Sequence, residues 1–485
     1  MSRDRLRDSL YGPTGVYTVS SDWPGDFPGR VLLSLCSLYE ASEGHDEERA
    51  DIMEQIARNM ATLDDHTNPD GYFGGIVRDV VDEQQVSGNS WFLRGLCKAY
   101  RLFHDTDVLA RIERIKETYL SAIGPTYAAY PLNCRRAGGV GGALDGNVIN
   151  GWKTSTDVGC AFIMLDGMTD VYDLTGDEKL ADIIRSVIGR FASADYVSLR
   201  FQTHATLSCA RGILRFYRHT GEETYLRLAE SIFENYRQLG MTYDYANLNW
   251  FGRPDTWTEP CGVVDSLIVA KWLYQITGKG EYLRFFNRCA SNALRTMQRN
   301  NGGAGCSTCA TGDHYMLKNS LYEAFFCCSL RLGELFSEMH SFLFTPAEDG
   351  ILVPFMGDCT LEEDGIRVRV TSDYPASAPV TIETGAFAET APLYVYVPDG
   401  VSVGGGVVSG NLLRVTPRAG TTCSFPVTAK PRREGAFCLI GDTFLTRKQV
   451  PEAPLFTLDG EAFSLIYDNS RFTESELNSH PEYLR

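Results

Sequence analysis

A recurring helical hairpin is the feature that most restricts the fold of this 485-residue chain. In its first two thirds, an apolar stretch ends in tyrosine, a polar turn follows, and a second amphipathic stretch begins. The turns start at Tyr39, Tyr100, Tyr172, Tyr217 and Tyr274. Three of them contain Thr-Gly, which suits the end of a helix because glycine tolerates the left-handed cap conformation. On both sides of the turns apolar residues recur with the helical period, so each unit predicts two antiparallel helices.

The number of hairpins predicts a closed ring. Five hairpins are visible, and an apolar stretch near residues 320–340 supplies a sixth. Their spacing along the chain is too uneven for a simple solenoid. We therefore expect an (α/α)6 barrel of inner and outer helices over residues 1–340. An open helical array is the alternative architecture.

The pattern changes after about His340. Segments such as Ile366-Arg-Val-Arg-Val and Leu393-Tyr-Val-Tyr-Val alternate apolar and polar residues, as half-buried strands do, and Pro and Gly separate them. This pattern predicts a C-terminal antiparallel β-sandwich over residues 341–450. Residues 451–485 form a tail that we expect to pack back on the barrel.

Composition limits the class of partner and the compartment. The formal net charge of −17 disfavours nucleic acid, because the phosphates would be repelled. No apolar run approaches the roughly 18 residues that a membrane span needs. The charged N-terminus, Met1-Ser-Arg-Asp, has no apolar segment behind it, so no secretory signal is expected. These features favour a cytoplasmic protein without a membrane partner, in which most of the 14 cysteines are reduced.

Two short motifs carry metal-binding chemistry. Glu259-Pro-Cys261 precedes an apolar helical stretch, and Cys327-Cys328 lies far downstream in another. Three thiols and a carboxylate are donors that suit a tetrahedral zinc ion. Adjacent cysteines are poor disulfide partners, because the bridge would strain the local backbone. The motifs predict one shared Zn2+ site; buried, inert cysteines are the alternative.

A second grouping of thiols competes with this one. Cys306-Ser-Thr-Cys309 is a C-x-x-C element on a glycine-rich segment. With Cys327 and Cys328 it could form an all-thiolate zinc site, or the two cysteines could be a redox couple. A single C-x-x-C is a weak zinc signal, so this grouping remains an alternative.

The motifs resemble those of glycoside hydrolase family 127, the zinc- and cysteine-dependent β-L-arabinofuranosidases. That family carries Glu-x-Cys followed by Cys-Cys, and Thr203-His204-Ala is similar to its Gly-His-Ala segment. The resemblance implies zinc ligands at Glu259, Cys261, Cys327 and Cys328. It also implies that Cys327 is the nucleophile of a retaining mechanism and that His204 contacts the sugar.

The chain departs from the family at the acid/base residue. The family has a glutamate upstream of the ligand glutamate, and Tyr243 occupies that position here. The neighbouring Asp244 is our candidate proton donor, with Asp255 as the alternative. On the same loop, Trp257 could stack on a sugar ring, and Asn247 and Arg253 could contact its hydroxyl groups.

Together these features predict a retaining hydrolase of small furanosides that acts on a small glycoside or oligosaccharide. Another barrel chemistry, such as sugar epimerisation or unsaturated uronide hydrolysis, is the enzymatic alternative. A carbohydrate-binding scaffold with a structural zinc is the non-enzymatic one. Barrels of this kind often pair, so a homodimer is a candidate assembly.

Overall fold

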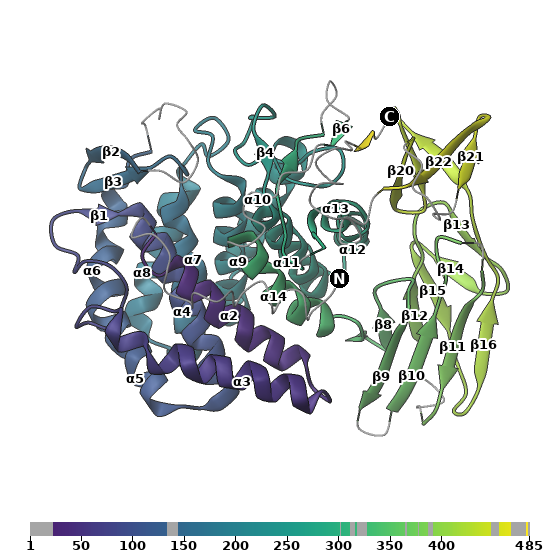
Figure 1. The fold of residues 1–485 in the computed structure, drawn as a ribbon, viewed down its shortest axis with the longest axis horizontal. Helices are drawn as coiled ribbons and strands as arrows, with labels where there is room; N and C mark the ends of the chain where they lie inside the picture. Colours follow the sequence, from purple (N-terminus) through teal and green to yellow (C-terminus); the bar gives the residue numbers. More distant parts are fainter. Residues whose placement is uncertain are drawn as a thin grey trace.

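Helices form the first part of the molecule and strands form the second (Figure 1). The computed structural model describes residues 23–132, 144–300, 302–310, 316–317, 327–363, 366–376, 378–386, 391–447, 455–466 and 482–483. The helices are α2 (Asp26–Ala41), α3 (Asp46–Ala61), α4 (Glu83–Phe103), α5 (Thr106–Ile115), α6 (Ser121–Ile123), α7 (Met164–Thr175), α8 (Glu178–Ala192), α9 (Thr203–Thr220), α10 (Glu223–Leu239), α11 (Pro260–Thr277), α12 (Gly280–Cys289), α13 (Arg295–Met297) and α14 (Cys327–His340). None of these helices has the length and apolar character that crossing a bilayer requires.

The predicted turns end their helices as the sequence indicates. Gly176, Gly221 and Gly278 are C-caps with positive φ, and each glycine N–H donates to the carbonyl of the tyrosine that opens the turn. Asp177 then caps α8, because its carboxylate accepts hydrogen bonds from two backbone N–H groups of the first turn. The turn after Tyr100 uses His104 in the same left-handed conformation. Each of these four turns therefore reverses the chain into an antiparallel helix.

Six of the described helices close into a ring. In order around it, α2 packs on α4, α4 on α7, α7 on α9, α9 on α11, α11 on α14, and α14 returns to α2. The ring helices, such as α9 and α11, are buried over most of their length, whereas α8 and α10 bury only one face and lie outside. Because the order of helix contacts returns to its start, the open helical array is excluded and the predicted helical ring is confirmed. The sixth hairpin is described only from Cys327 onward, since residues 321–326 lie outside the described part.

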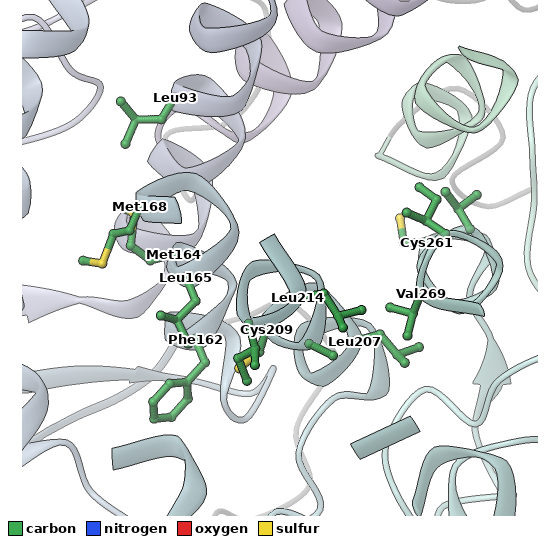
Figure 2. Close-up of a cluster of buried hydrophobic side chains, with 14 of the residues drawn as sticks. Leu93, Phe162, Met164, Leu165, Met168, Leu207, Cys209, Leu214, Cys261 and Val269 are labelled. Carbon is green, nitrogen blue, oxygen red and sulfur yellow. The ribbon is translucent and has the colours of Figure 1, made fainter. Parts of the chain in front are cut away.

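Apolar side chains fill most of the space between the ring helices. Figure 2 shows part of this core, to which α4, α7, α9 and α11 contribute Leu93, Met168, Leu207 and Val269. Cys261 belongs to the same cluster. The core therefore extends up to the N-terminal end of α11, where the first predicted motif lies.

A network of buried ions also crosses the ring. Its members come from α4, α7, α9, α11 and α14 and are Arg94, Arg211, Arg215, Arg331, Asp166, Asp170, Asp265 and Glu334. Asp265, for example, accepts hydrogen bonds from Arg211 and Arg331. Buried ion pairs of this kind contribute little net stability, but an unpaired member is costly. The network therefore favours one relative register of the ring helices.

Short strands accompany the helices. They are β1 (Val81–Asp82), β2 (Leu144–Ile149), β3 (Trp152–Ser155), β4 (Trp257–Thr258), β5 (Ser307–Thr308) and β6 (Met316–Leu317). In the antiparallel pair β4–β5, Thr258 lies opposite Ser307. This pair brings the C-x-x-C segment beside the Glu259 motif.

The strand-rich region begins with two sheets. Their strands are β7 (Thr345–Pro346), β8 (Ile351–Val353), β9 (Cys359–Glu363), β10 (Ile366–Thr371), β11 (Val380–Thr384), β12 (Leu393–Tyr396), β14 (Val407–Ser409), β15 (Leu412–Val415) and β16 (Thr422–Phe425). One sheet has the order β16-β11-β10-β9 and the other β14-β15-β12-β8-β7. Val368 and Val370 of the first sheet share a hydrophobic cluster with Val395 and Leu413 of the second. The inward-facing residues of both sheets therefore form one core.

One pairing differs from the antiparallel expectation. β12 runs parallel to β8. Parallel neighbours need a long crossover connection, and the chain between β8 and β12 supplies it by forming β9, β10 and β11 of the other sheet. Alternation within each strand predicts a half-buried face but not the direction of its neighbour.

The C-terminal segment joins both parts of the molecule. Its strands are β13 (Val401–Val403), β17 (Val427–Ala429), β18 (Pro431–Glu434), β19 (Phe437–Ile440), β20 (Thr443–Thr446), β21 (Phe456–Leu458), β22 (Glu461–Leu465) and β23 (Glu482–Tyr483). A sheet of order β18-β19-β20-β22-β21 takes in residues 456–465, which lie within the predicted tail. β23 pairs with β6 of the helical part.

Candidate metal centre

The start of α11 positions the first two predicted ligands. Glu259 is the N-cap residue, and Pro260 occupies the first helical position, where a missing N–H has little cost. The Glu259 backbone N–H donates to Asn247 Oδ1 at 2.9 Å. Gln202 Nε2 donates to Glu259 Oε2 at 3.3 Å. The carboxylate and the Cys261 thiol are thus fixed by the helix end and by two amide side chains.

The cysteine pair meets Cys261 between two neighbouring helices of the ring. Cys327 and Cys328 are the first described residues of α14, which packs against α11. Cys328 Sγ lies 3.8 Å from Cys261 Sγ and 3.8 Å from Cys327 Sγ. A disulfide would need a sulfur–sulfur distance of about 2.05 Å, so the three sulfurs are unbridged neighbours.

Glu259, Cys261, Cys327 and Cys328, hereafter the Glu/Cys cluster, form one group. One donor atom from each lies within 4.8 Å of all the others. All four residues are buried, but Cys327 keeps 8% of its surface exposed, whereas Cys261 and Cys328 keep 0%. Soft sulfur donors with one carboxylate can hold a metal ion, and Cys327 is the sulfur most open to a ligand.

The environment separates the acidities of the thiols. Burial disfavours the thiolate of Cys261, but hydrogen bonds from the two other cluster cysteines and the charge of Arg30 outweigh it, so its pKa falls well below the usual range. Burial, together with hydrogen bonds to Cys261 and Cys306, raises the pKa of Cys328. Of these two thiols, Cys261 is therefore the one on which negative charge is favoured.

Arg30 of α2 lies against the cluster. Its Nη1 donates to Cys261 Sγ at 3.6 Å, and its Nε donates to Asp26 Oδ1 at 2.8 Å. The guanidinium carbon lies 4.1 Å from the centre of the Trp91 ring. This arginine was not among the predicted site residues.

His204 has partners at both ring nitrogens. Nε2 lies 3.5 Å from Arg30 Nη2, and Nδ1 is hydrogen-bonded to Asp265. Because a guanidinium can only donate, Nε2 accepts, and the Nδ1–H group donates a hydrogen bond to the Asp265 carboxylate. The ring also stacks on Trp91 and is 2% exposed. The structure places His204 beside the cluster, but its polar atoms already bind protein groups.

Asn247 supports the cluster from beneath. It is fully buried, its Oδ1 accepts from the Glu259 backbone, and its Nδ2 donates to Thr203 Oγ1 at 3.0 Å. No part of its amide reaches the surface. In the structure Asn247 supports Glu259, and its contact with a sugar stays a prediction.

Trp257 and Arg253 lie farther out on the same loop. Trp257 is partly exposed and packs edge-on against Trp250, with ring centres 5.3 Å apart. Arg253 forms two hydrogen bonds to Asp255, at 2.8 and 2.9 Å. Trp257 directly precedes the Thr258-Glu259 segment, whereas Arg253 is engaged on the outer part of the loop.

The two candidate acids, Asp244 and Asp255, differ in burial and in the direction of their pKa shifts. Asp244 is 1% exposed, its Oδ1 accepts a hydrogen bond from Thr242, and burial raises the pKa of its carboxyl to about 6. Hydrogen bonding to Arg253 lowers the pKa of the exposed Asp255. Among the described contacts, those of Asp244 stay within its own loop and do not reach the Glu/Cys cluster.

The two cysteines of the competing C-x-x-C element have different surroundings. Cys306 lies next to Cys328, and its carbonyl accepts a hydrogen bond from Arg299 at 2.8 Å. Burial raises the pKa of Cys309 to about 12, which disfavours a reactive thiolate. Within the described residues, the group that can hold a metal contains neither of them.

Sequence reasoning missed Arg30, Gln202 and Asp265. A usable signal exists for two of them, because Arg30 and Asp265 are charges inside otherwise apolar helical stretches. A charge in such a position must be paired or functional. Gln202 has no comparable signal.

The described fold and site are those of a helical ring with a thiol-rich centre, joined to a strand-rich region. Solved glycoside hydrolases share this fold. One is a GH127 β-L-arabinofuranosidase from Geobacillus stearothermophilus T6, with a TM-score of 0.63, 12% identity and coverage of 91% of this chain and 80% of that one. A GH127 β-arabinofuranosidase has a TM-score of 0.63, 12% identity and coverage of 91% and 78%.

A third structure, a glycoside hydrolase, has a TM-score of 0.64 and 12% identity, with coverage of 95% of this chain and 86% of that one. The predicted resemblance to family 127 is thus confirmed at the level of the fold. The sequence itself matches no family model and no curated protein.

Proposed function

We propose that this protein is a retaining glycoside hydrolase that acts on small furanosides of the β-L-arabinofuranoside type. In this proposal the Glu/Cys cluster binds Zn2+ and Cys327 is the nucleophile. The observation that carries it is the gathering of the four donors, with Cys327 as the most exposed of the three sulfurs. The shared fold with GH127 enzymes supports the same chemistry.

The donor set fits zinc. Two thiolates bound at about 2.3 Å to a tetrahedral zinc ion lie about 3.8 Å apart. The sulfurs of Cys261 and Cys327 each lie 3.8 Å from that of Cys328. Two of the three sulfur–sulfur distances therefore match the spacing of zinc ligands, and all four donor atoms lie within 4.8 Å of one another. When bound, zinc would hold the cysteine sulfurs as thiolates at neutral pH.

The proposed reaction has two steps. Cys327 Sγ attacks the anomeric carbon, the glycosidic C–O bond breaks, and the leaving oxygen takes a proton from Asp244. Water then attacks the anomeric carbon of the S-glycosyl intermediate and passes its proton to the Asp244 carboxylate. The thiolate of Cys327 leaves, and two inversions give retained configuration.

Asp244 is favoured over Asp255 as the acid. A proton donor must still hold its proton near the working pH, and the raised pKa of Asp244, about 6, meets this need. Asp255 is held ionised by Arg253. Closure of the loop on a bound sugar would have to bring Asp244 within hydrogen-bond reach of the leaving oxygen.

The remaining predicted residues are proposed to bind the sugar. Trp257 offers a partly exposed ring two residues before Glu259, which suits stacking on a sugar face. Arg253 could contact hydroxyl groups at the rim of the site. His204 could contact the sugar only by exchanging its Nε2 partner, Arg30, for a hydroxyl group.

The test is hydrolysis of aryl glycosides by the native protein and by Cys327→Ala. We expect turnover of an aryl β-L-arabinofuranoside, retained configuration in the first product, and a loss of at least about 10³-fold in the variant. Cys209→Ala is the matched control, because Cys209 is a buried ring cysteine outside the cluster. It should keep native turnover.

The same experiment separates the alternatives. A sugar epimerase or an unsaturated uronide hydrolase would not depend on Cys327 as a nucleophile, so full activity in Cys327→Ala would exclude the proposed mechanism. A carbohydrate-binding scaffold would bind zinc and sugar without turnover. Mass spectrometry of the native protein with a slow furanosyl substrate should show a sugar on Cys327, and its absence there would contradict the covalent step.

A further inference from the structure

We propose that Arg30 is a positioning residue of the metal centre whose guanidinium supplies the positive charge that the Glu/Cys cluster needs to retain its cation. The inference rests on the proposed function, because it takes zinc as the bound ion. It adds a residue from α2, far from the two ligand motifs in sequence.

The cluster has an excess of negative charge. Ligand thiols and carboxyls bind a metal in their deprotonated forms. The three thiolates and one carboxylate of the cluster carry four negative charges against the two positive charges of zinc. The site is buried, so water compensates little of this excess. A cation in contact with the ligands would therefore stabilise the bound state.

Arg30 is placed to be that cation. It is 5% exposed and donates a hydrogen bond from Nη1 to Cys261 Sγ. Hydrogen bonds from a charged donor stabilise a thiolate directly. Arginine suits the position because it stays protonated when buried.

Other groups hold the guanidinium in place. Asp26, one turn earlier on α2, binds Nε, and the ring of Trp91 covers the guanidinium plane. His204 accepts from Nη2, and Asp265 fixes the tautomer of His204. A continuous chain thus runs from Asp265 through His204 and Arg30 to Cys261.

These contacts distinguish Arg30 from a substrate-binding arginine. Three of its five N–H groups face Asp26, His204 and Cys261, its face is covered by Trp91, and only 5% of the residue is exposed. Its direct contact with the cluster is through Cys261. For this reason we assign it to holding the metal and not to contacting the sugar.

The test measures zinc affinity directly. The native full chain, Arg30→Gln and Arg30→Lys are titrated with Zn2+ against a chromophoric chelator, and Co2+ is used to record the thiolate-to-metal absorption. Arg30→Gln removes the charge but keeps polar donors, and we expect about a 10- to 100-fold loss of zinc affinity, the usual effect of losing a partner of a metal ligand. Arg30→Lys keeps the positive charge but lacks the planar set of guanidinium N–H donors, so its loss of zinc affinity should be smaller.

Arg215→Gln is the matched control. Arg215 is also a buried arginine of the ring, but it binds Asp166 and Thr169 on α7. It should keep native zinc affinity, and circular dichroism checks that each variant is folded. If Arg30→Gln does not fold, Arg30→Met decides, because it removes the charge but keeps an unbranched, flexible side chain; native zinc affinity in folded Arg30→Met would overturn the proposal.

The outcomes separate this inference from the proposed function. Native zinc affinity in folded Arg30→Gln, or an equal loss in Arg215→Gln, would overturn the role of Arg30 even if the native protein hydrolyses furanosides. Zinc binding that depends on Arg30 without any hydrolysis would support the role of Arg30 and contradict the proposed activity alone. A native protein that binds no zinc would overturn both.

Discussion

Asp244 occupies a site that controls when it carries a proton. Its carboxyl group is buried and receives few hydrogen bonds, so water cannot stabilise the charged form. Burial therefore raises the pKa of the group to about 6. Such a value is useful to an acid that must lose and regain a proton in each catalytic cycle.

The first prediction concerns the pH dependence of hydrolysis. A general acid works only while protonated, so kcat/KM should be constant below the pKa of Asp244 and fall as the pH rises through about 6. Asp244→Asn should lose this descending limb and most activity on substrates with poor leaving groups. The measurement is a pH profile of kcat/KM for native protein and variant.

Asp255→Asn is the control for this prediction. Asp255 is on the same loop, but its side chain is exposed and paired with Arg253. The variant should keep the native profile. A descending limb that persists unchanged in Asp244→Asn would assign the titration to another group.

The single residues that sequence predicted best are those with specific chemistry. Glu259, Cys261, Cys327 and Cys328 were predicted to share a site, and their donor atoms lie together. The loop residues were harder, because Asn247 and Arg253 are equally plausible as sugar contacts or as structural partners. Only the folded structure shows that the Asn247 amide oxygen accepts a hydrogen bond from the Glu259 backbone.

At the scale of the helices, close backbone contacts determine where Arg30 lies. Gly29 of α2 faces Phe92 of α4, and a methyl group at Gly29 would lie 2.2 Å from the Phe92 backbone nitrogen. Arg30 adjoins Gly29 in α2, and Trp91 adjoins Phe92 in α4. The guanidinium of Arg30 stacks on the ring of Trp91. The missing side chain at Gly29 therefore permits the contact that holds the guanidinium.

The second prediction is that Gly29→Ala lowers the free energy of unfolding. The added methyl group must push α2 away from α4, since the obstacle is backbone and not a flexible side chain. Overpacking of this kind costs about 1–3 kcal/mol. Chemical denaturation followed by tryptophan fluorescence measures the change.

Gly189→Ala provides the opposite control. Gly189 lies within α8 on the exposed side of the ring, and a methyl group there would meet nothing within 4 Å. Alanine should stabilise this helix by about 0.5–1 kcal/mol, because it restricts the unfolded backbone. Equal stability of Gly29→Ala and the native protein would show that α2 and α4 can separate freely.

The elements differ in how well sequence predicts them. The helices and their turns follow from period and from glycine caps, which are local properties. The two-residue strands β4 and β5 have no periodic signal, yet they bring Cys306 to the cluster. Their pairing depends on the ring that holds them and could not be predicted from either segment.

At the scale of the whole molecule, a polar contact joins the ring to the strands. Arg288 of α12 donates two hydrogen bonds to Glu434 of β18, at 2.7 and 2.8 Å, and one to Asp399 at 2.9 Å. Asn292 donates to the carbonyl of Asp442 at 2.9 Å. The two parts therefore have complementary charges where they meet.

The third prediction is that Arg288→Met uncouples the two parts. The Arg288 side chain is 8% exposed, but Glu434 is about half exposed, so the loss should be modest, about 2 kcal/mol. All 6 tryptophans lie before residue 273, so their fluorescence reports on the ring. Limited proteolysis measures unfolding of the strand-rich region. In Arg288→Met this region should unfold at a lower denaturant concentration than the ring does by fluorescence.

Arg237→Met is the control for the junction. Arg237 pairs with Glu234 and Glu281 on partly exposed surface of the ring. Such pairs contribute little, so both transitions should stay together. Coincident transitions in Arg288→Met would show that other contacts are sufficient to hold the two parts.

The arrangement of the whole was the least predictable level. Charge, composition and alternation indicated two parts, but they carry no information on which faces meet. The side chains of Arg288, Asp399 and Glu434 resemble any surface charges in the sequence. Their pairing exists only because the third sheet lies against α12 and the segment after it.

Closure of the ring by α2 and α14 has a consequence for biosynthesis. The Glu/Cys cluster takes Glu259 and Cys261 from α11 and the cysteine pair from the last ring helix, and Arg30 beside it comes from the first described helix. A nascent chain still on the ribosome before residue 327 possesses two of the four donors and lacks the helix that joins the ends. If the cluster binds an ion as proposed, loading must wait until almost the entire helical part has been synthesised, and a chain released earlier would lack two ligands that added metal cannot replace.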